Sequence, residues 1–589
     1  MSDYAPPLDD IRFVLDEILD LAGLAKLPTF EHADSELVHG ALAEAGRFAA
    51  EVTAPLNRVG DREHSRRNAD GSVTTPEGFA AAYRRYVESG WGSVPFPQQY
   101  GGGGFPWLVA TAIGEMMASA NAAFSLAPTL TQGAIDLLLA HGSERQKDTY
   151  LNKMVTGEWT GTMNLTEPDA GSDLGAVRTK AVPDGDVWRI TGQKAFITYG
   201  EHDLADNIVH LVLARVPDAP AGTRGISCFI VPKVLVGADG QLGEHNRVVC
   251  VSIEDKLGIH ASPTCVLDFD DAEGYLIGEP NEGMRYMFTM MNNARLVVGV
   301  QGVAIAERAY QQAVAYAMER HQGRAPGAAA GVSSPIIEHP DVRRMLLTQK
   351  ASIEAARSLA YLVAESMDLA ANHTDQVVRD SHRELVELLT PVTKAWCTDL
   401  GVELSSIALQ VQGGAGYIEE TGAAQYYRDA RISPIYEGTN GIQAIDLVMR
   451  KLSMRDGAAV TDFIGQIEAL DIQLELAGPE LSSIGTNLAA AIATLRSATE
   501  ALSRAESVDR LAGAGPYLRM FGIVTGGWLM ARQALAATRK LNTGQTDFLR
   551  AKLVTARFYC EQILPQAAGL FPAATAGAGD LLALTPDQF

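Results

Sequence analysis

Hydrophobic residues recur with helical spacing over much of the first quarter of the chain. Between Leu8 and Leu19 they stand at positions 8, 11, 15, 18 and 19, and similar spacing continues intermittently to about residue 155. This pattern predicts a first domain that is mostly helix. The glycine run at 101–104 lacks the spacing of a phosphate-binding loop and follows no predicted strand, so we interpret it as an interhelical loop.

The spacing changes between about residues 158 and 269. Short runs of β-branched and aromatic residues alternate there with clusters of Asp, Gly and Pro, which is the pattern of strands joined by turns. We predict a mainly antiparallel β domain of roughly a hundred residues. Its predicted strands are 187–191, 195–199, 207–216, 226–232 and 247–253.

Helical spacing returns after residue 281 in long segments joined by short loops, which is typical of a helix bundle. From about residue 453 onward an apolar stripe marks a further helical domain that is nearly neutral in charge. The predicted helices are 284–322, 340–372, 379–412 and 440–453, and the stripe is Leu481, Ile484, Leu488, Ile492 and Leu495.

Taken together, these patterns predict an α+β fold in four parts. They are an N-terminal helical domain over 1–157, a central β domain over 158–280, a helical bundle over 281–452 and an additional helical domain over 453–589.

Composition narrows the class of protein. The chain has 589 residues, 47% of them hydrophobic, and a formal net charge of −23, which argues against a general nucleic-acid binder. Its five cysteines contain no CxxC and indicate free thiols in a reducing compartment. The acidic N-terminus lacks a signal-like apolar segment, and the uncharged stretches 116–135 and 562–579 are broken by proline. We therefore expect a cytoplasmic protein without a membrane span.

The sequence motifs of several common catalytic and nucleotide-binding sites are absent. The sequence contains no HExxH, no GxSxG, no Walker loop and no GxGxxG after a strand. No two histidines stand four residues apart, so we predict no metal site.

Two stretches of the predicted β domain carry polar and aromatic residues suited to a flat ligand. MNLTEPDAGSDLGAV, at 163–177, offers free backbone N–H groups together with the hydroxyls of Thr166 and Ser172, although an ordinary β-turn would have the same composition. RITGQKAFITYG, at 189–200, places Phe196 and Thr198 on one strand face by period two, a pairing that half-buried strands also carry routinely.

A third stretch, at 411–443, contains Glu437 in a short loop before a predicted helix. Asn440 resembles an N-cap, with Gln443 three residues later. Burial beside apolar neighbours would raise the pKa of Glu437, whereas the helix N-terminus would lower it, and these residues alone do not decide between the two. A solvated loop carboxylate is the alternative reading of this stretch.

Motifs in all of these regions resemble those of the acyl-CoA dehydrogenase family. The resemblance covers about 35–453, and the family fold, an N-terminal helical domain, a central β domain and a C-terminal four-helix domain, accounts for the predicted order of domains. The motifs are TEPDAGSD, ITGQKAFIT, EDKLGIHASPTCVLDFDD, NNARLVVGVQGVAIAERAYQQAVAYAMER, QVQGGAGY and RDARISPIYEGTNGIQ.

The resemblance implies FAD-dependent α,β-dehydrogenation of an acyl-CoA thioester. Glu437 matches the general base that removes the α-proton while the β-hydrogen leaves as hydride to flavin N5. The backbone N–H of Glu437 and a ribityl hydroxyl of the flavin would polarise the thioester oxygen. Some members carry the base just before an arginine on an earlier helix, but here Ala294 precedes Arg295, so Glu437 has no rival.

By the same matching, several residues are expected to contact ligands. Arg295, Tyr436, Gly438 and Ser172 are expected to contact the substrate. Four further residues match positions that hold the FAD of a neighbouring subunit, namely Arg320, Gln322, Gln410 and Gly414. The remaining expected FAD contacts are Met163, Leu165, Thr166, Gly171, Ser172, Phe196, Thr198 and Thr439.

Departures from the family pattern point to one branch. Gly323 stands where many members have phenylalanine, an Ala/Gly/Ser-rich insertion follows it, and Phe196 stands where tryptophan is usual. With the extra domain after 453, the chain resembles the long branch that includes 3-methylmercaptopropionyl-CoA dehydrogenases and broad-range fatty acyl-CoA dehydrogenases.

The resemblance also implies partners and defines the alternatives. We expect an electron-transferring flavoprotein as electron acceptor and a homodimer, with a tetramer as the alternative. The other functions considered are an acyl-CoA oxidase, a DNA-associated flavoprotein of the same fold and a scaffold without activity. The near-neutral last domain argues against DNA binding, and Glu437 beside intact flavin motifs argues against an inactive scaffold.

Overall fold

A computed structural model describes residues 4–541, 544 and 546–589 of the chain. The described residues form two compact units, which we treat separately. The first contains Glu44–Phe105 and Met116–Val297, and the second contains Tyr4–Ala43, Pro106–Glu115 and most of Val298–Phe589.

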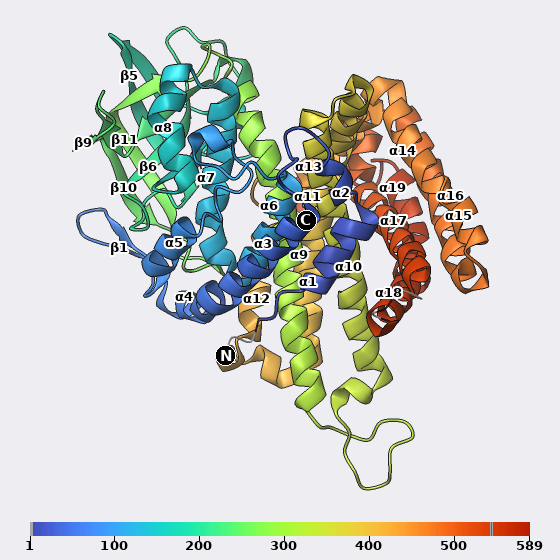
Figure 1. Cartoon of the computed structure of the whole chain (residues 1–589). Helices are drawn as coiled ribbons and strands as arrows, with labels where there is room; N and C mark the ends of the chain where they lie inside the picture. Colours follow the sequence, from blue (N-terminus) through green and yellow to red (C-terminus); the bar gives the residue numbers. More distant parts are fainter. Residues whose placement is uncertain (1–3, 542–543, 545) are drawn as a thin grey trace. The chain divides into compact units, whose positions relative to one another are not determined.

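The first unit is built on a mixed β-sheet of seven strands (Figure 1). The strand order is β3-β6-β7-β11-β5-β4, with β10 paired to β11. Only β3 and β6 run parallel; the other neighbouring strands pair antiparallel, as the predicted β domain requires. The strands are β3 (Trp159–Asn164), β4 (Lys180–Asp184), β5 (Val187–Thr198), β6 (Asn207–Ala214), β7 (Ser227–Pro232), β10 (Val248–Ile253) and β11 (Thr264–Leu276).

Two strands predicted separately at 187–191 and 195–199 form the single strand β5, because the chain continues through Gly192 without a turn. Two small hairpins accompany the sheet, namely β1 (Arg66–Arg67) with β2 (Val73–Thr74) and β8 (Val234–Val236) with β9 (Leu242–His245). The sheet core contains buried residues from several strands, such as Ile190, Val212, Phe229 and Phe269.

Helices pack against the sheet through β3, which contacts α7 (Ala122–His141) and α8 (Glu144–Thr156). The unit also contains α4 (Asn57–Glu63) and α5 (Phe79–Glu88), and the glycine run at 101–104 lies between helices as predicted. In the part of the chain that the structure describes, α7 alone is long and apolar enough to cross a membrane. Its most apolar window is 78% buried, as in the core helix of a globular protein.

The second unit is helical. The predicted bundle helices are present as α10 (Pro340–Asn372), α11 (Gln376–Gln412) and α13 (Asn440–Met449), and α12 (Ala423–Ala430) precedes α13. The helix predicted at 284–322 is α9 (Gly283–Glu319). The helix predicted from Leu8 begins as α1 (Leu8–Phe13) and continues as a π-helical turn at Val14–Ile18, before α2 (Leu21–Leu24). Two further helices, like α9, have residues in both units, namely α3 (Ser35–Phe48) and α6 (Trp107–Ala120).

The last part of the second unit, orange to red in Figure 1, gathers around α17 (Ser507–Lys540), which contacts α10, α11 and α13. The predicted apolar stripe is buried: Leu481 lies directly before α16 (Ser482–Arg504), and the other four residues lie on it. The remaining helices are α14 (Ala458–Glu468), α15 (Asp471–Leu476), α18 (Thr546–Phe558) and α19 (Gln566–Thr575).

Candidate active site

Glu437 lies in a tight bend between α12 and α13. Its φ angle is +56°, in the left-handed region, and Gly438 follows at +86°. A non-glycine residue in that region costs about 1–3 kcal/mol and persists only where its surroundings enforce it. Two backbone hydrogen bonds close the bend, from Tyr436 N–H to Ile432 C=O at 3.2 Å and from Asn440 N–H to Pro434 C=O at 2.9 Å. The half-buried carboxylate is therefore presented by a constrained backbone.

The N-terminus of α13 anchors the bend from the other side. Thr439, not Asn440, is the N-cap, since its hydroxyl accepts a hydrogen bond from Ile442 N–H at 3.2 Å. The prediction for Asn440 was thus wrong by one residue, because Asn440 already has helical geometry and uses its side chain elsewhere. Its amide donates to Asp399 at 2.7 Å and accepts from buried Lys394 at 2.8 Å, which ties the loop to α11.

Tyr436 supports Glu437 from within the second unit. Its hydroxyl donates to Gln301 on α9. Burial, with a further contribution from the negative charge of Glu437, raises the pKa of Tyr436 well above its ordinary value. The phenol therefore stays protonated, and its bond to Gln301 helps hold the loop against the bundle.

In the first unit, the segment after β3 lies against β5. Ala195 N–H donates to Thr166 C=O at 2.9 Å, and the ammonium of Lys194 donates to Leu165 C=O at 3.0 Å. The structure thus brings the motifs TEPDAGSD and ITGQKAFIT together, as the resemblance implies.

Most residues of the first unit that are expected to contact FAD are at least partly exposed. The ring of Phe196 is 62% exposed, although large aromatic side chains are usually buried. Thr198, Thr166 and Met163 are half-buried, and Gly171 and Ser172 are exposed. Leu165 differs, because its side chain is buried and its carbonyl already accepts from Lys194.

The other predicted ligand contacts lie on helices. Arg295 is on α9, where its guanidinium lies 5.9 Å from the ring centroid of Phe288. In the second unit, four exposed residues lie near the ends of long helices. Arg320 and Gln322 follow α9 and hydrogen-bond to each other at 3.3 Å. Gln410 and Gly414 lie at the end of α11.

Sequence reasoning missed Lys194 and Glu167, which form a buried ion pair at 2.8 Å between the ITGQKAFIT and TEPDAGSD stretches. The sequence carried no clear signal for the pair, because β5 contains Arg189 and Gln193 as well as Lys194. Over 4–541, 544 and 546–589, no group of three or more His, Cys, Asp or Glu side chains is arranged to hold a metal ion.

Comparison with known domains identifies the class of protein. Residues 40–158, 162–272 and 281–452 match the N-terminal, middle and C-terminal domains of acyl-CoA dehydrogenases, and 459–585 match the domain described as "Acetyl-CoA dehydrogenase C-terminal like". The chain belongs to the acyl-CoA dehydrogenase family, whose members are flavin-dependent oxidoreductases.

Full-length relatives place the chain more closely. It is 46% identical to the 3-methylmercaptopropionyl-CoA dehydrogenase of Ruegeria pomeroyi, over 95% of this chain and 96% of the relative. It is 35% identical to a butyryl-CoA dehydrogenase of Syntrophomonas wolfei, over 97% of each chain. A broad-specificity linear acyl-CoA dehydrogenase of Mycobacterium tuberculosis is 34% identical, over 96% of each chain. The resemblance to the long branch is confirmed.

Solved structures agree with the fold. ACDH-11 of Caenorhabditis elegans, in complex with C11-CoA, superimposes with a TM-score of 0.75 at 20% identity, over 96% of this chain and 92% of the other. The butyryl-CoA dehydrogenase of Megasphaera elsdenii is 26% identical with a TM-score of 0.57, over 70% of this chain and 97% of its own.

Proposed function

We propose that the protein catalyses FAD-dependent α,β-dehydrogenation of an acyl-CoA thioester to the trans-2-enoyl-CoA, with Glu437 as the base. The observation that carries the assignment of Glu437 is its backbone at φ +56°, because such strain concentrates where a side chain must be held for function. Family membership supports the reaction type.

The residues of the first unit fit a flavin. An exposed aromatic ring at Phe196 suits stacking against a flat heteroaromatic group, and the half-buried hydroxyl of Thr198 can hydrogen-bond its polar edge. Nothing lies within 4 Å of the position a Cβ would take at Gly171, so the loop leaves room for a close approach. When bound, FAD supplies the acceptor for the hydride that leaves the β-carbon.

The protein's own residues would supply binding and proton transfer. The carboxylate of Glu437 would accept the α-proton as the Cα–H bond breaks, and that electron pair forms the new double bond as the β-hydrogen leaves with its own pair. The Thr439 cap and the Asn440 contacts hold Glu437 in place, so the base needs little reorganisation. The Glu437 backbone N–H would donate to the thioester oxygen, where negative charge develops.

The relatives suggest which substrates to test. The 46% identical protein is named for 3-methylmercaptopropionyl-CoA and the 35% identical protein for butyryl-CoA, so we propose a short acyl chain, with a methylthio substituent as the first candidate. An electron-transferring flavoprotein is the proposed acceptor, and rapid reaction of the reduced enzyme with O₂ would instead identify an oxidase. We propose the cytoplasm as its location.

The decisive experiment is anaerobic bleaching of bound FAD by 3-methylmercaptopropionyl-CoA, butyryl-CoA and longer acyl-CoAs. The wild-type protein should bleach, and Glu437→Gln should slow bleaching by at least about 10²-fold because the base is lost. Glu468→Gln, at an exposed carboxylate at the end of α14, is the matched control and should bleach at the wild-type rate. A Glu437→Gln protein that bleaches as fast as wild type would refute the assigned base.

We also propose a homodimer. The exposed residues Arg320, Gln322, Gln410 and Gly414 are accompanied by exposed apolar side chains, since Tyr417 is 88% and Ile418 is 51% exposed. Side chains of this kind support a contact with a second copy of the chain.

A further inference from the structure

Lys194 is a buried cation in strand β5 of the first unit, between β11 and the edge strand β4. Its side chain is fully buried, and its ammonium donates to Leu165 C=O at 3.0 Å and to the Glu167 carboxylate at 2.8 Å. Burial lowers the pKa of Lys194 to about 8. A buried amine is costly unless it is paired. Here its partners are Glu167 in the TEPDAGSD segment and Leu165 directly before that segment.

Glu167 joins three parts of the chain. Besides Lys194, its carboxylate accepts from Arg178 N–H at 2.7 Å, from Thr179 N–H at 3.0 Å and from the Thr179 hydroxyl at 2.5 Å. Burial raises the pKa of Glu167, but the charge of Lys194 and these donors more than offset it, so the pKa lies below its ordinary value. The ion pair therefore fastens the 165–170 loop to the segment before β4 and to β5.

A β-bulge sets the direction of Lys194. The register between β5 and β11 shifts between the pairs Lys194–Leu267 and Ile197–Cys265, and Phe196, within the bulge, has φ +59°. Without the shift, period two would put Lys194 on the same face as Phe196 and Thr198. The bulge turns the lysine inward and leaves the phenylalanine ring outward.

We infer that the Lys194–Glu167 pair is the positioning element of the flavin site: it holds the Leu165–Thr166 backbone against Ala195–Thr198 so that both segments present one binding surface. The inference rests on the proposed function. Lys194 acts without touching the cofactor, through the carbonyl of Leu165 and the carboxylate of Glu167. Loss of either contact should loosen the surface that binds FAD.

The test uses the full-length protein, stripped of FAD and titrated with FAD by flavin fluorescence, with thermal unfolding measured in parallel. Lys194→Met should raise the FAD dissociation constant by about tenfold or more, because a charged donor to the loop is lost. It should also change the visible absorption spectrum of the bound flavin. Lys233→Met is the matched control, since it removes an ion pair of the same unit, Lys233–Glu201, whose two residues lie outside the 163–172 loop. Its FAD affinity should stay within about twofold of wild type.

A second variant separates positioning from stability. Lys194→Met combined with Glu167→Gln leaves no buried unpaired charge, so it should fold and recover much of the unfolding temperature lost in Lys194→Met. Its FAD affinity should remain about tenfold or more below that of the wild type, because Leu165 C=O still lacks its donor. Wild-type FAD affinity in either folded variant would overturn the inference.

Because these titrations contain no acyl-CoA, they test the positioning role separately from the proposed reaction. A wild-type protein that binds FAD tightly but is not bleached by any acyl-CoA would contradict the dehydrogenation alone. Equal FAD affinity in wild type and the double variant would contradict the positioning role alone.

Discussion

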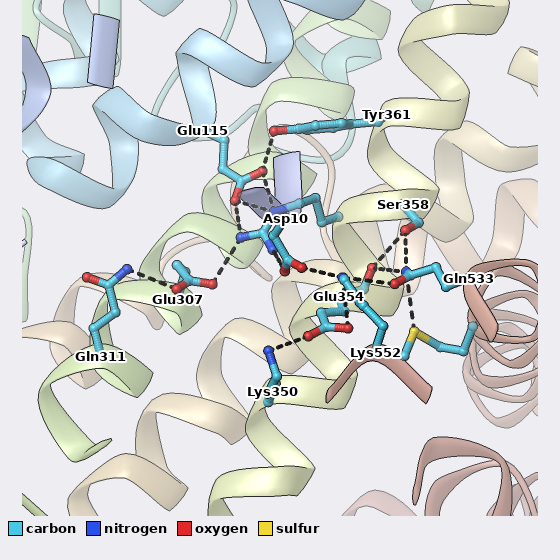
Figure 2. Close-up of polar contacts among 12 residues, drawn as sticks. Asp10, Glu115, Glu307, Gln311, Lys350, Glu354, Ser358, Tyr361, Gln533 and Lys552 are labelled. Carbon is cyan, nitrogen blue, oxygen red and sulfur yellow. Dashed lines mark hydrogen bonds and ion pairs between the residues drawn. The ribbon is translucent and has the colours of Figure 1, made fainter. Parts of the chain in front are cut away.

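Replacement of Lys552 by methionine should destabilise the second unit strongly. Lys552 lies on α18 with its side chain 1% exposed, and its ammonium is 3.1 Å from the Glu354 carboxylate and 3.0 Å from the Gln533 amide oxygen. It also forms an ion pair with Asp10 near the N-terminus (Figure 2). One side chain thus links three distant parts of the sequence.

The size of the effect follows from the surrounding charges. Attraction between unit charges 3.1 Å apart is about 5 kcal/mol at an effective dielectric constant of about 20. The buried network contains four carboxylates and three cations, so the loss of Lys552 leaves the excess of negative charge larger. Removing one partner of a buried ion pair costs about 3–5 kcal/mol, and we expect a loss in this range. The members are Asp10, Glu115, Glu307, Glu354, Lys350, Arg357 and Lys552.

Asp10 provides an independent readout of the same network. Burial raises its pKa, but the positive charges of Lys552, Lys350 and Arg357 more than offset burial and hold the pKa below its ordinary value. Its contribution to stability is therefore present at neutral pH and is lost as the pH falls toward the lowered pKa. In Lys552→Met the pKa of Asp10 should rise toward its ordinary value, so the stability that Asp10 loses on acidification should be smaller than in the wild type.

The assay is urea unfolding at pH 7 followed by circular dichroism, with the free energy taken from the cooperative transition. Arg496→Met, which removes the exposed pair with Glu468, is the control and should change this free energy by less than about 1 kcal/mol. Adding Glu354→Gln to Lys552→Met should recover part of the loss. A loss below about 1 kcal/mol in Lys552→Met would refute the reasoning.

Two other predictions concern acid stability and assembly. Burial lowers the pKa of both His202 and His210 to about 3. Between pH 6.5 and pH 3 the unfolded state therefore binds more protons than the folded state, so the free energy of unfolding decreases as the pH is lowered. At pH 5 this decrease is about 2 kcal/mol for each histidine. His210→Gln should reduce the drop between pH 7 and pH 5 by about this amount in urea unfolding, and an unchanged drop would contradict the assignment. Tyr417→Glu should shift the proposed dimer toward monomer in light scattering, because a charge would enter an apolar contact. Val377→Glu, at another exposed apolar side chain, should leave the mass unchanged, and an unaltered mass in Tyr417→Glu would place any dimer contact elsewhere.

Local pattern was sufficient for most of the secondary structure. Bundle helices predicted at 340–372 and 379–412 begin and end within three residues of α10 and α11, because an apolar stripe of period 3.6 survives any tertiary context that buries one face. The cap of α13 was misassigned by one residue, since Thr439 and Asn440 are both good N-caps and only the backbone geometry distinguishes them.

Some of the site was also readable from the motifs. Alternation predicted an accessible face for Phe196 and Thr198, and the structure leaves both at least partly exposed. Alternation would also have placed Lys194 on that face, which the bulge at Phe196 prevents. The strain at Glu437 was not readable, because a positive φ at a non-glycine residue depends on the contacts that close the bend.

The order of helical and β segments, the apolar faces and the motifs were thus determined by the sequence alone, since they depend on residues near one another in the chain. The tertiary structure decided where the buried charges go. A one-residue bulge turned Lys194 inward, and folding brought Lys552 to Asp10 and Glu354 across hundreds of residues. A charged residue is tolerated in a core only when its partner is close, and no local pattern records a partner that is distant in sequence.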